Sequence, residues 1–458
     1  MTQQGEYSIL KLTGRLKLGY LLYACAIASL ALPAFATEET RVLQARINAA
    51  AEQGGGVVRL DKGTHVIGQL QLKSNVTLEL AEGALVLAST NRSDYSLKRF
   101  RAFIGAVGAT NVTVCGKGII DGRGRALVWD IMQGMALSNQ FDRVSWFKTP
   151  PVHPRPDERE RPHLLSFHAC TNVVVKGIEM RNGACWMNTY HYCKGVKIEG
   201  VRIIGRGFWN NDGIDLCDTS DVLVQNCFVD SADDSICLKS HSLTGINENI
   251  IIRDCTIRSS GSAIKFGTAS AGVFRNIRIE NIEIYDTFRS AIAIESVDGS
   301  YISDVVVSDV RARNVGNGLF VRLGSRSNTG GSIKGIQINR LHAEVADKKP
   351  DAGFEIEGPP IRAKDVLPIV ISGLPDKLIE DVTLRGCTFI FPGGNPNSRA
   401  ELVVPEEPAK YPEFSMFVNL PAWAVYARHI KKLDLGDTVF VAKNPDKRKK
   451  FAGNYFDK

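Results

Sequence analysis

Residues 221–229 read DVLVQNCFV, and residues 249–257 read NIIIRDCTI on the same template. That template is a turn residue, two apolar positions separated by a position that accepts any residue, a polar bend, and a second short alternating run. The most regular copies begin at Asn172, Gly195, Asp221, Asn249, Asn276 and Asp304, with starts 23 to 28 residues apart. Copies separated by insertions begin at Asn75, Asn111, Gly335 and Asp381. One unit cannot bury its apolar face alone, so the repeat predicts a stacked solenoid.

Each copy provides two or three very short strands with no helix between them. This arrangement favours a parallel β-helix over a leucine-rich or ankyrin solenoid. Inward positions would then form aliphatic ladders, and outward positions on neighbouring rungs would lie about 4.8 Å apart. Hairpin signals such as Asn-Gly, which a sandwich would need, are scarce. The sequence therefore predicts an all-β, single-stranded parallel β-helix.

The first rung of a solenoid needs a cap. The segment ETRVLQARINAAAEQGGG, residues 39–56, has helical spacing at Val42, Leu43 and Ile47 and ends at three glycines. Glycine commonly terminates a helix because it adopts the left-handed conformation at little cost. We expect an N-terminal capping helix here.

The remaining chain, residues 37–458, is expected to form one β-helix domain. Two stretches break the repeat, near 123–162 and 342–375, and both are expected to be loop insertions. The first is rich in Arg, Pro and aromatic residues, and it would form either a wall of a substrate site or a packing flap. From about residue 400 the chain is Pro-rich and non-repeating, which predicts a tail packed on the solenoid.

The N-terminus resembles an export signal. Three basic residues, the last of them Lys17, precede the apolar run LGYLLYACAIASLAL, and PAFA ends at Ala36. This pattern predicts a signal peptide over residues 1–36, cleaved near Ala36, and hence a secreted or periplasmic protein. Cys25 leaves lipoprotein processing open. The apolar run is shorter than the roughly 20 residues needed to cross a bilayer, and no later segment is longer, so no membrane span is expected.

Charge and cysteine usage narrow the class of partner. The net charge is +7, and loss of three cations and one acid with the leader gives about 7 − 3 + 1 = +5. A mildly basic protein suits an acidic polymer, and the absence of a dense Lys/Arg block argues against nucleic acid.

The cysteines show neither C-x-x-C nor zinc spacing, so no metal or cofactor is predicted. A solenoid needs no partner to fold, so we expect a monomer.

Nine cysteines remain after cleavage. Cys227, Cys255 and Cys387 lie in the middle of strand patterns, which predicts buried, stacked thiols. Cys185 and Cys193 are the one pair that we consider for a local disulfide.

Residues 210–240, NNDGIDLCDTSDVLVQNCFVDSADDSICLKS, contain seven aspartates. Asp212 and the pair Asp233 and Asp234 occupy corresponding bends on consecutive rungs, so we expect them side by side on one outer surface. Mutual repulsion should raise the pKa of at least one of them, and such a cluster indicates acid–base chemistry or a cation. Glycoside hydrolysis fits, because it needs a protonated carboxyl and a carboxylate. The alternatives are bend capping by Asp212 and Asp234 and calcium binding, as in a lyase.

Neighbouring rungs carry further polar side chains. Lys239, Lys265, Glu295 and Arg322 follow the acidic bends within strand-like segments. Each could simply be a solvated outward residue. Their recurrence near the aspartates makes them candidates for substrate binding.

Several segments resemble family 28 of the glycoside hydrolases, the polygalacturonase family. The likeness is carried by INAAAEQGGGVVRLDKGTHVIGQLQLKSNVTLELAEGALVLAS, GKGIIDGRG, RNGACWMNTYHYCKGVKIEGVRI, NNDGID and ADDSICLKS. It covers most of residues 41–390. The resemblance implies a right-handed parallel β-helix, an inverting hydrolase of α-linked pectic polysaccharide, and no cofactor.

By position in the family motifs, the resemblance assigns roles to four residues. Asp233 would be the general acid, and Asp212 and Asp234 would hold and deprotonate the water. Asn210 would help to shape that site.

Two departures concern the substrate. The family's Gly-His-Gly aligns with a segment that has Ser262 in place of the histidine, and its Arg-Ile-Lys aligns with Ala293, Ile294 and Glu295. The cations that would grip a uronate beyond the cleaved bond are absent, and Glu295 would repel it. This loss is similar to the rhamnogalacturonan-cleaving branch, in which a neutral sugar lies beyond the bond.

Lys239, Lys265 and Arg322 could still bind a carboxylate on the other side of the bond. Two other classes stay open. One is a β-helix polysaccharide lyase, which needs calcium and an Arg or Lys base, and the other is a non-catalytic carbohydrate-binding β-helix or adhesin.

Overall fold

The structure is a computed structural model that describes residues 37–456, apart from 98–99, 130–132, 134–155, 327–329 and 354–366. The expected leader, residues 1–36, lies outside the described residues. So do most of the first expected insertion and the middle of the second.

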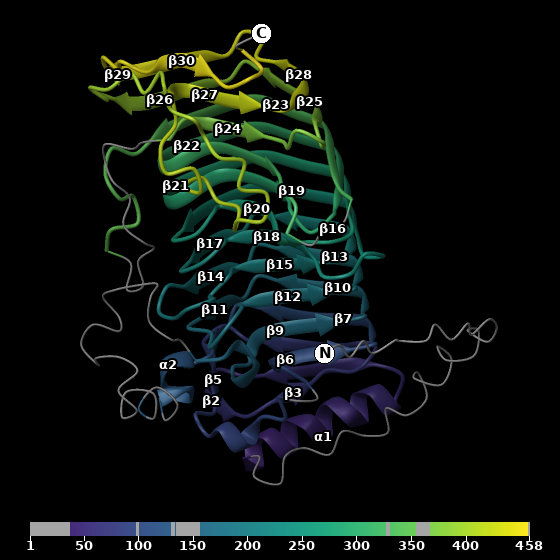
Figure 1. Ribbon diagram of the computed structural model, residues 1–458. Helices are drawn as coiled ribbons and strands as arrows, with labels where there is room; N and C mark the ends of the chain where they lie inside the picture. Colours follow the sequence, from purple (N-terminus) through teal and green to yellow (C-terminus); the bar gives the residue numbers. More distant parts are fainter. Residues whose placement is uncertain are drawn as a thin grey trace, which may run out of the picture.

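The described chain is a long parallel β-helix, as predicted (Figure 1). Thirty strands hydrogen-bond to one another across successive rungs, and every pairing between named strands is parallel. The strands fall into three faces. Backbone hydrogen bonds run along the stack, so each rung is held by the one before it and the one after it.

The first face contains β1 Gly56–Leu60, β4 Val76–Leu80, β7 Thr110–Gly116, β10 Thr171–Lys176, β13 Lys194–Glu199, β16 Ser220–Gln225, β25 Ile379–Arg385 and β28 Ile430–Asp434. The second contains β2 Gly63–Ile67, β5 Ala84–Ala88, β8 Ile119–Asp121, β11 Glu179–Arg181, β14 Arg202–Gly205, β17 Phe228–Ser231, β26 Thr388–Gly393 and β29 Val439–Asn444. The third contains β3 Leu70–Gln71, β6 Ala102–Val107, β9 His163–His168, β12 Asn188–His191, β15 Ile214–Cys217, β18 Ile236–Ser240, β20 Ile264–Ser270, β24 Ile369–Ser372, β27 Ala422–Arg428 and β30 Lys449–Ala452. Four strands turn corners between faces: β19 Ile246–Ser259, β21 Val273–Ser296, β22 Tyr301–Leu323 and β23 Ser332–Val345.

The polar residue that opens each repeat makes a corner. Asp221, Asn249 and Asn276 have φ values of 57°, 55° and 51°, in the left-handed region that Asn and Asp tolerate best among residues with a side chain. Their side chains also form a ladder, because Asn249 donates to Asp221 and Asn276 donates to Asn249, each at 2.8 Å. These two demands explain why the template begins with Asn or Asp.

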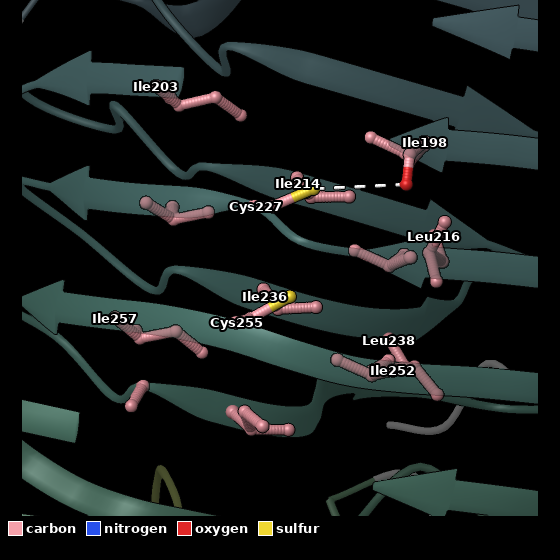
Figure 2. Close-up of a cluster of buried hydrophobic side chains, with 14 of the residues drawn as sticks. Ile198, Ile203, Ile214, Leu216, Cys227, Ile236, Leu238, Ile252, Cys255 and Ile257 are labelled. Atoms are coloured by element: carbon pink, nitrogen blue, oxygen red, sulfur yellow. Dashed lines mark hydrogen bonds between the residues drawn. The ribbon is translucent and has the colours of Figure 1, made fainter. Parts of the chain in front are cut away.

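The interior is a continuous stack of aliphatic side chains. Figure 2 shows Cys227 and Cys255 within it, one rung apart and beside Ile214 and Ile236. All nine cysteines in the described residues are free thiols, and eight of them are buried. The disulfide considered between Cys185 and Cys193 is therefore not formed.

An N-terminal helix, α1 Glu38–Glu52, caps the first rung. Thr37 is the N-cap of this helix, because its hydroxyl accepts a hydrogen bond from the amide of Thr40. Leu43 and Ile47 are buried, whereas Val42 is 49% exposed, so the buried stripe is narrower than the spacing predicted. Further helical turns in the described residues include α2 Gly124–Leu127, η1 Arg92–Asp94 and η2 Glu158–Glu160.

The C-terminal region differs from the expectation of a tail to the end of the chain. The tail, residues 394–421, lies between β26 and β27, and residues 422–452 then return to the β-helix. The long excursion hides the repeat from sequence inspection. Among the described residues, no helix is long and apolar enough to cross a membrane.

Candidate active site

Three of the predicted site residues lie together at the corner between the second and third faces. Asp212 ends the connection from β14 to β15, and Asp233 and Asp234 lie in the connection from β17 to β18 on the next rung. One carboxylate oxygen from each of the three lies within 4.8 Å of the others. The bends of the repeat therefore gather three acids on one surface.

Backbone bonds between rungs set this spacing. The amide of Gly213 donates to the carbonyl of Asp234 at 3.0 Å, and the amide of Ser235 donates to the carbonyl of Ser262 at 2.9 Å. Gly261 lies so close that an added Cβ would be 2.7 Å from the Asp234 amide nitrogen. The next rung can pass the acidic bend only because this position has no side chain.

Lys239, which lies on the third face, binds two acids. Its Nζ lies 2.7 Å from Asp212 Oδ2 and also contacts Asp215. The same ammonium group lies 3.7 Å from the ring centroid of Trp186. Asp215 was not among the predicted site residues, but its alternation with Ile214, which faces inward, was a readable signal that it faces outward.

Lys265 performs a similar task one rung further on. Its Nζ lies 3.1 Å from Asp234 Oδ2 and 4.0 Å from Glu295 Oε2. The amide of Ser262 donates to the other Asp234 oxygen at 2.8 Å. Asp234 is thus held on both oxygens, and Ser262 contributes through its backbone.

The surroundings of the acids shift their pKa values by different amounts and in different directions. Burial raises the pKa of Asp212 well above its usual value, and burial raises that of Asp215 to about 6. Burial also opposes ionisation of Asp234, but the nearby cations, Lys265 first among them, outweigh it and lower the pKa of that carboxyl. Asp233 is half-buried, whereas Asp212 and Asp234 are each 4% exposed, so Asp233 is the acid that a bound molecule reaches most readily.

Both lysines are firmly charged. Burial alone would lower their pKa values, but Asp212 and Asp215 beside Lys239, and Asp234 and Glu295 beside Lys265, raise them well above the usual value. Neither amine can act as a base near neutral pH. Two ammonium groups beside the acids also disfavour a divalent cation there.

Asn210 is held from behind the site. Its side-chain oxygen accepts a hydrogen bond from Arg161 Nη2 at 2.8 Å, and the same guanidinium donates to the carbonyls of Ala184 and Trp209 at 3.0 and 2.8 Å. Arg161 is fully buried and ties together the connections that carry Asn210 and Trp186. Sequence reasoning missed it because it lies outside the repeat.

Three predicted substrate-binding residues are covered. Lys265 and Glu295 are each 1% exposed, and Arg322 is fully buried. Arg322 donates to the carbonyls of Glu406 and Glu407 in the tail at 2.8 and 3.1 Å. All three side chains are therefore enclosed by protein rather than exposed at the surface, and a role for them in binding a sugar stays a prediction. Burial also raises the pKa of Glu295 to about 8, so this carboxyl is mostly neutral at neutral pH.

Aromatic rings continue from the cluster along the third face. His163 stacks on Trp186 at 5.1 Å, Trp186 on His191 at 6.1 Å with 6° between their planes, and His191 on His241 at 6.4 Å. Burial lowers the pKa of His191 to about 3, so its ring is neutral. Flat neutral rings of this kind can stack on sugars. The segment ACWMNTYHYC contained the signal, but sequence reasoning did not use it.

A hollow of about 350 Å³ lies on the N-terminal side of the cluster, at the same corner of the β-helix. Its lining includes Arg123 and Arg125, and also Gly207 and Phe208 from the connection that ends in Asp212. Guanidinium groups bind carboxylates well. The hollow is therefore a second polar feature on the surface that carries the acids.

The fold and this cluster define a class: a parallel β-helix with acid–base groups gathered on one outer corner. The family model described as Glycosyl hydrolases family 28 matches residues 56–343, more than half of the 458 residues. The chain belongs to glycosyl hydrolase family 28.

Individual relatives are distant. A probable polygalacturonase of Vitis vinifera is 25% identical over 281 residues, which cover 56% of this chain and 53% of that protein. The chain thus spans about half the length of that relative. The family 28 exopolygalacturonase of Yersinia enterocolitica superposes with a TM-score of 0.65 at 17% identity, over 92% of this chain and 76% of that one. A hyperthermoactive exopolygalacturonase from Thermotoga maritima gives 0.57 at 18% identity, over 88% of each chain. Likeness at these identities shows the fold.

Proposed function

We propose that this protein hydrolyses α-glycosidic bonds in a pectic polysaccharide, in the manner of a polygalacturonase or a rhamnogalacturonan hydrolase, with inversion at the anomeric carbon. The observation that carries the proposal is the cluster of Asp212, Asp233 and Asp234, in which nearby cations lower the pKa of the buried Asp234 and Asp233 is the most accessible acid. Hydrolysis of a glycoside requires one carboxyl that donates a proton and one carboxylate that accepts a proton, and we assign these tasks to Asp233 and Asp234.

In this proposal Asp233 protonates the glycosidic oxygen as the bond to the anomeric carbon breaks. A water molecule attacks that carbon from the opposite face and loses its proton to the carboxylate of Asp234, while Asp212 holds the water in place. Lys265 keeps Asp234 ionised. Asp212 Oδ1 has no hydrogen-bond partner among the described residues, so it is available to hold the water.

The spacing of the acids makes stereochemistry a decisive test. Oxygens of the three acids lie within 4.8 Å, closer than the roughly 6.5–9.5 Å that separates acid and base in most inverting enzymes. Because the acids are so close, inversion requires the water to lie at the edge of the cluster, where Asp212 and Asp234 can both hold it. Retention would instead identify one of the acids as a nucleophile.

The surroundings of the cluster support an acidic substrate with a neutral sugar on one side. Arg123 and Arg125 lie on the N-terminal side, where they could pair with a uronate. On the C-terminal side the rung carries Ala293 and the mostly neutral Glu295. This asymmetry favours a rhamnogalacturonan backbone over unmodified galacturonan.

The first experiment compares the wild type, Asp233→Asn and the control Asp221→Asn on polygalacturonan and on rhamnogalacturonan backbone. Asp221 is a corner residue in a ladder where other rungs already carry Asn, so its variant changes charge without touching the site. New reducing ends should fall about 10²–10⁴-fold in Asp233→Asn alone, while binding to the polymer persists. Proton NMR of the first product gives the anomeric configuration.

Equal activity of the two variants would remove Asp233 from the mechanism. Polymer binding without cleavage in the wild type would favour the non-catalytic alternative. A product that absorbs ultraviolet light would indicate a lyase, which the charged state of Lys239 and Lys265 disfavours. We further propose that the protein is exported through its N-terminal leader and acts as a monomer.

A further inference from the structure

The outward side chains of the third face form straight rows up the stack. One row runs in register through Thr189, Asp215, Cys237, Lys265, Ala293, Phe320, Val370 and Tyr426. Neighbours in such a row lie about 4.8 Å apart. Thr189, Asp215, Cys237 and Lys265 in this row are themselves buried, so a sugar chain that crossed the acidic cluster would lie outside the row, over the same face.

The C-terminal half of the row is occupied by the tail. Ala293, Phe320, Val370 and Tyr426 form a second hydrophobic cluster with tail residues, separate from the interior of the β-helix. The tail contributes Phe414, Met416, Phe417 and Leu420, all less than 5% exposed. Figure 1 shows this yellow-green segment descending from β26 across β24 and β22 towards β20. The row that begins beside the acids therefore ends under protein.

The tail is anchored along its whole length. Arg428 donates to the carbonyls of Val404 and Pro405 at 3.0 and 2.8 Å, and Arg322 holds the next two carbonyls. Further along, Glu413 pairs with the half-buried Arg289 at 2.8 Å. Charge-assisted contacts of this kind and an apolar underside make the tail a fixed wall.

The wall begins at the acids themselves. Tyr411 OH lies 3.3 Å from Lys265 Nζ, and Lys265 is the partner of Asp234. Tyr411 is nevertheless 48% exposed, so its ring borders the open side of the site. A sugar bound beyond the cleaved bond would meet this ring about one rung from Asp234.

We propose that the cleft is blind on its C-terminal side, so that the enzyme removes short saccharides from a chain end, and that Tyr411 is the residue that meets the terminal sugar. This inference rests on the proposed function. On the N-terminal side, the hollow that the described residues Arg123 and Arg125 help to line would accommodate the rest of the polymer.

The test follows the size of products during early digestion of rhamnogalacturonan and polygalacturonan. Chain-end attack releases one short product from the start, while viscosity falls slowly. A ladder of intermediate sizes with a rapid fall in viscosity overturns the inference and leaves the hydrolase intact. Absence of reducing ends from both polymers overturns the proposed function, and the inference falls with it.

Tyr411→Ala and the control Tyr301→Ala separate the role of the wall from general effects. Tyr301 is 55% exposed and lies at the start of β22, on the first face. Loss of ring contact should lower kcat/KM about fivefold or more for Tyr411→Ala, chiefly through KM, with an unchanged far-ultraviolet spectrum. Equal kcat/KM for both variants would show that Tyr411 does not contact the sugar.

Discussion

Lys239 Nζ lies 2.7 Å from Asp212 Oδ2 while it also contacts Asp215, so one buried ammonium group serves two buried carboxylates on the preceding rung. The ammonium group is itself stacked on Trp186. Asp212, which the catalytic proposal requires in a fixed position, thus depends on the same side chain as Asp215 and Trp186. This arrangement makes Lys239 a positioning residue whose loss should affect folding and activity together.

Replacement of Lys239 with Met should lower the free energy of unfolding by about 3–5 kcal/mol, because it leaves two buried acids without their cation. Chemical denaturation measures the change. Lys197→Met is the matched control, since Lys197 pairs with Glu199 at 3.0 Å on the outer, partly exposed side of β13, where an ion pair contributes little. The double variant Lys239→Met/Asp215→Asn should recover part of the loss. No recovery would mean that Asp215 does not share the charge of Lys239.

Glu295 predicts a pH dependence of stability. Burial raises its pKa in the folded protein from 4.5 to about 8, so its contribution is fully present below pH 4.5 and is lost as pH rises towards 8. Glu295→Gln lacks this dependence. The difference in unfolding free energy, wild type minus variant, should therefore fall between pH 5 and pH 8 and then level off. Glu283→Gln, on an exposed position of β21, is the surface control. A flat difference for Glu295→Gln would show that this carboxyl is ionised in the folded state.

The close approach of Gly261 to Asp234 predicts that a side chain at position 261 lowers activity. In Gly261→Ala the added carbon would lie 2.7 Å from the Asp234 amide nitrogen and 2.8 Å from its Oδ1, so the acidic bend must shift. We expect kcat to fall at least about tenfold, because small displacements of a catalytic group are costly. Gly56→Ala is the control, since its Cβ would meet only ordinary contacts of 3.4 Å or more. Full activity of Gly261→Ala would mean that the position of Asp234 is not critical.

Arg322 predicts how firmly the tail is held. Arg322→Met removes hydrogen bonds to Ser372 and to the carbonyls of Glu406 and Glu407, at a cost of about 2–4 kcal/mol. Limited proteolysis should then cut within residues 400–415 well before the β-helix. Arg313→Met, on an exposed position of β22, should leave the cleavage pattern of the wild type. Resistance of the tail in Arg322→Met would show that the apolar underside alone retains it.

The rung pattern and the acidic bends could be read from sequence because each rests on local rules. A corner that needs a left-handed residue selects Asn or Asp, as at Asn249, and an alternating strand separates Ile214 from Asp215. Stacking of identical rungs then places Asp212 beside Asp234 without further information.

The contacts of the tail that cover part of the site could not be predicted from the sequence. Contacts between Lys265 and Tyr411, or between Arg322 and Glu406, join residues that are 146 and 84 positions apart, and no repeat links them. Lys265 and Glu295 were therefore predicted to face a substrate, although both are buried and Tyr411 of the tail lies against Lys265. Residues 422–452 were missed for the same reason, because the excursion before them breaks the period.

The thiols sealed in the β-helix have a consequence for its recovery after heating. Eight of the nine described cysteines, including Cys227 and Cys255, are shielded from oxidants only while the rungs remain stacked. Melting exposes all of them at once, and air oxidation can then cross-link chains in arrangements that no rung can accept. Refolding on cooling should therefore succeed in the presence of a reductant and fail in its absence.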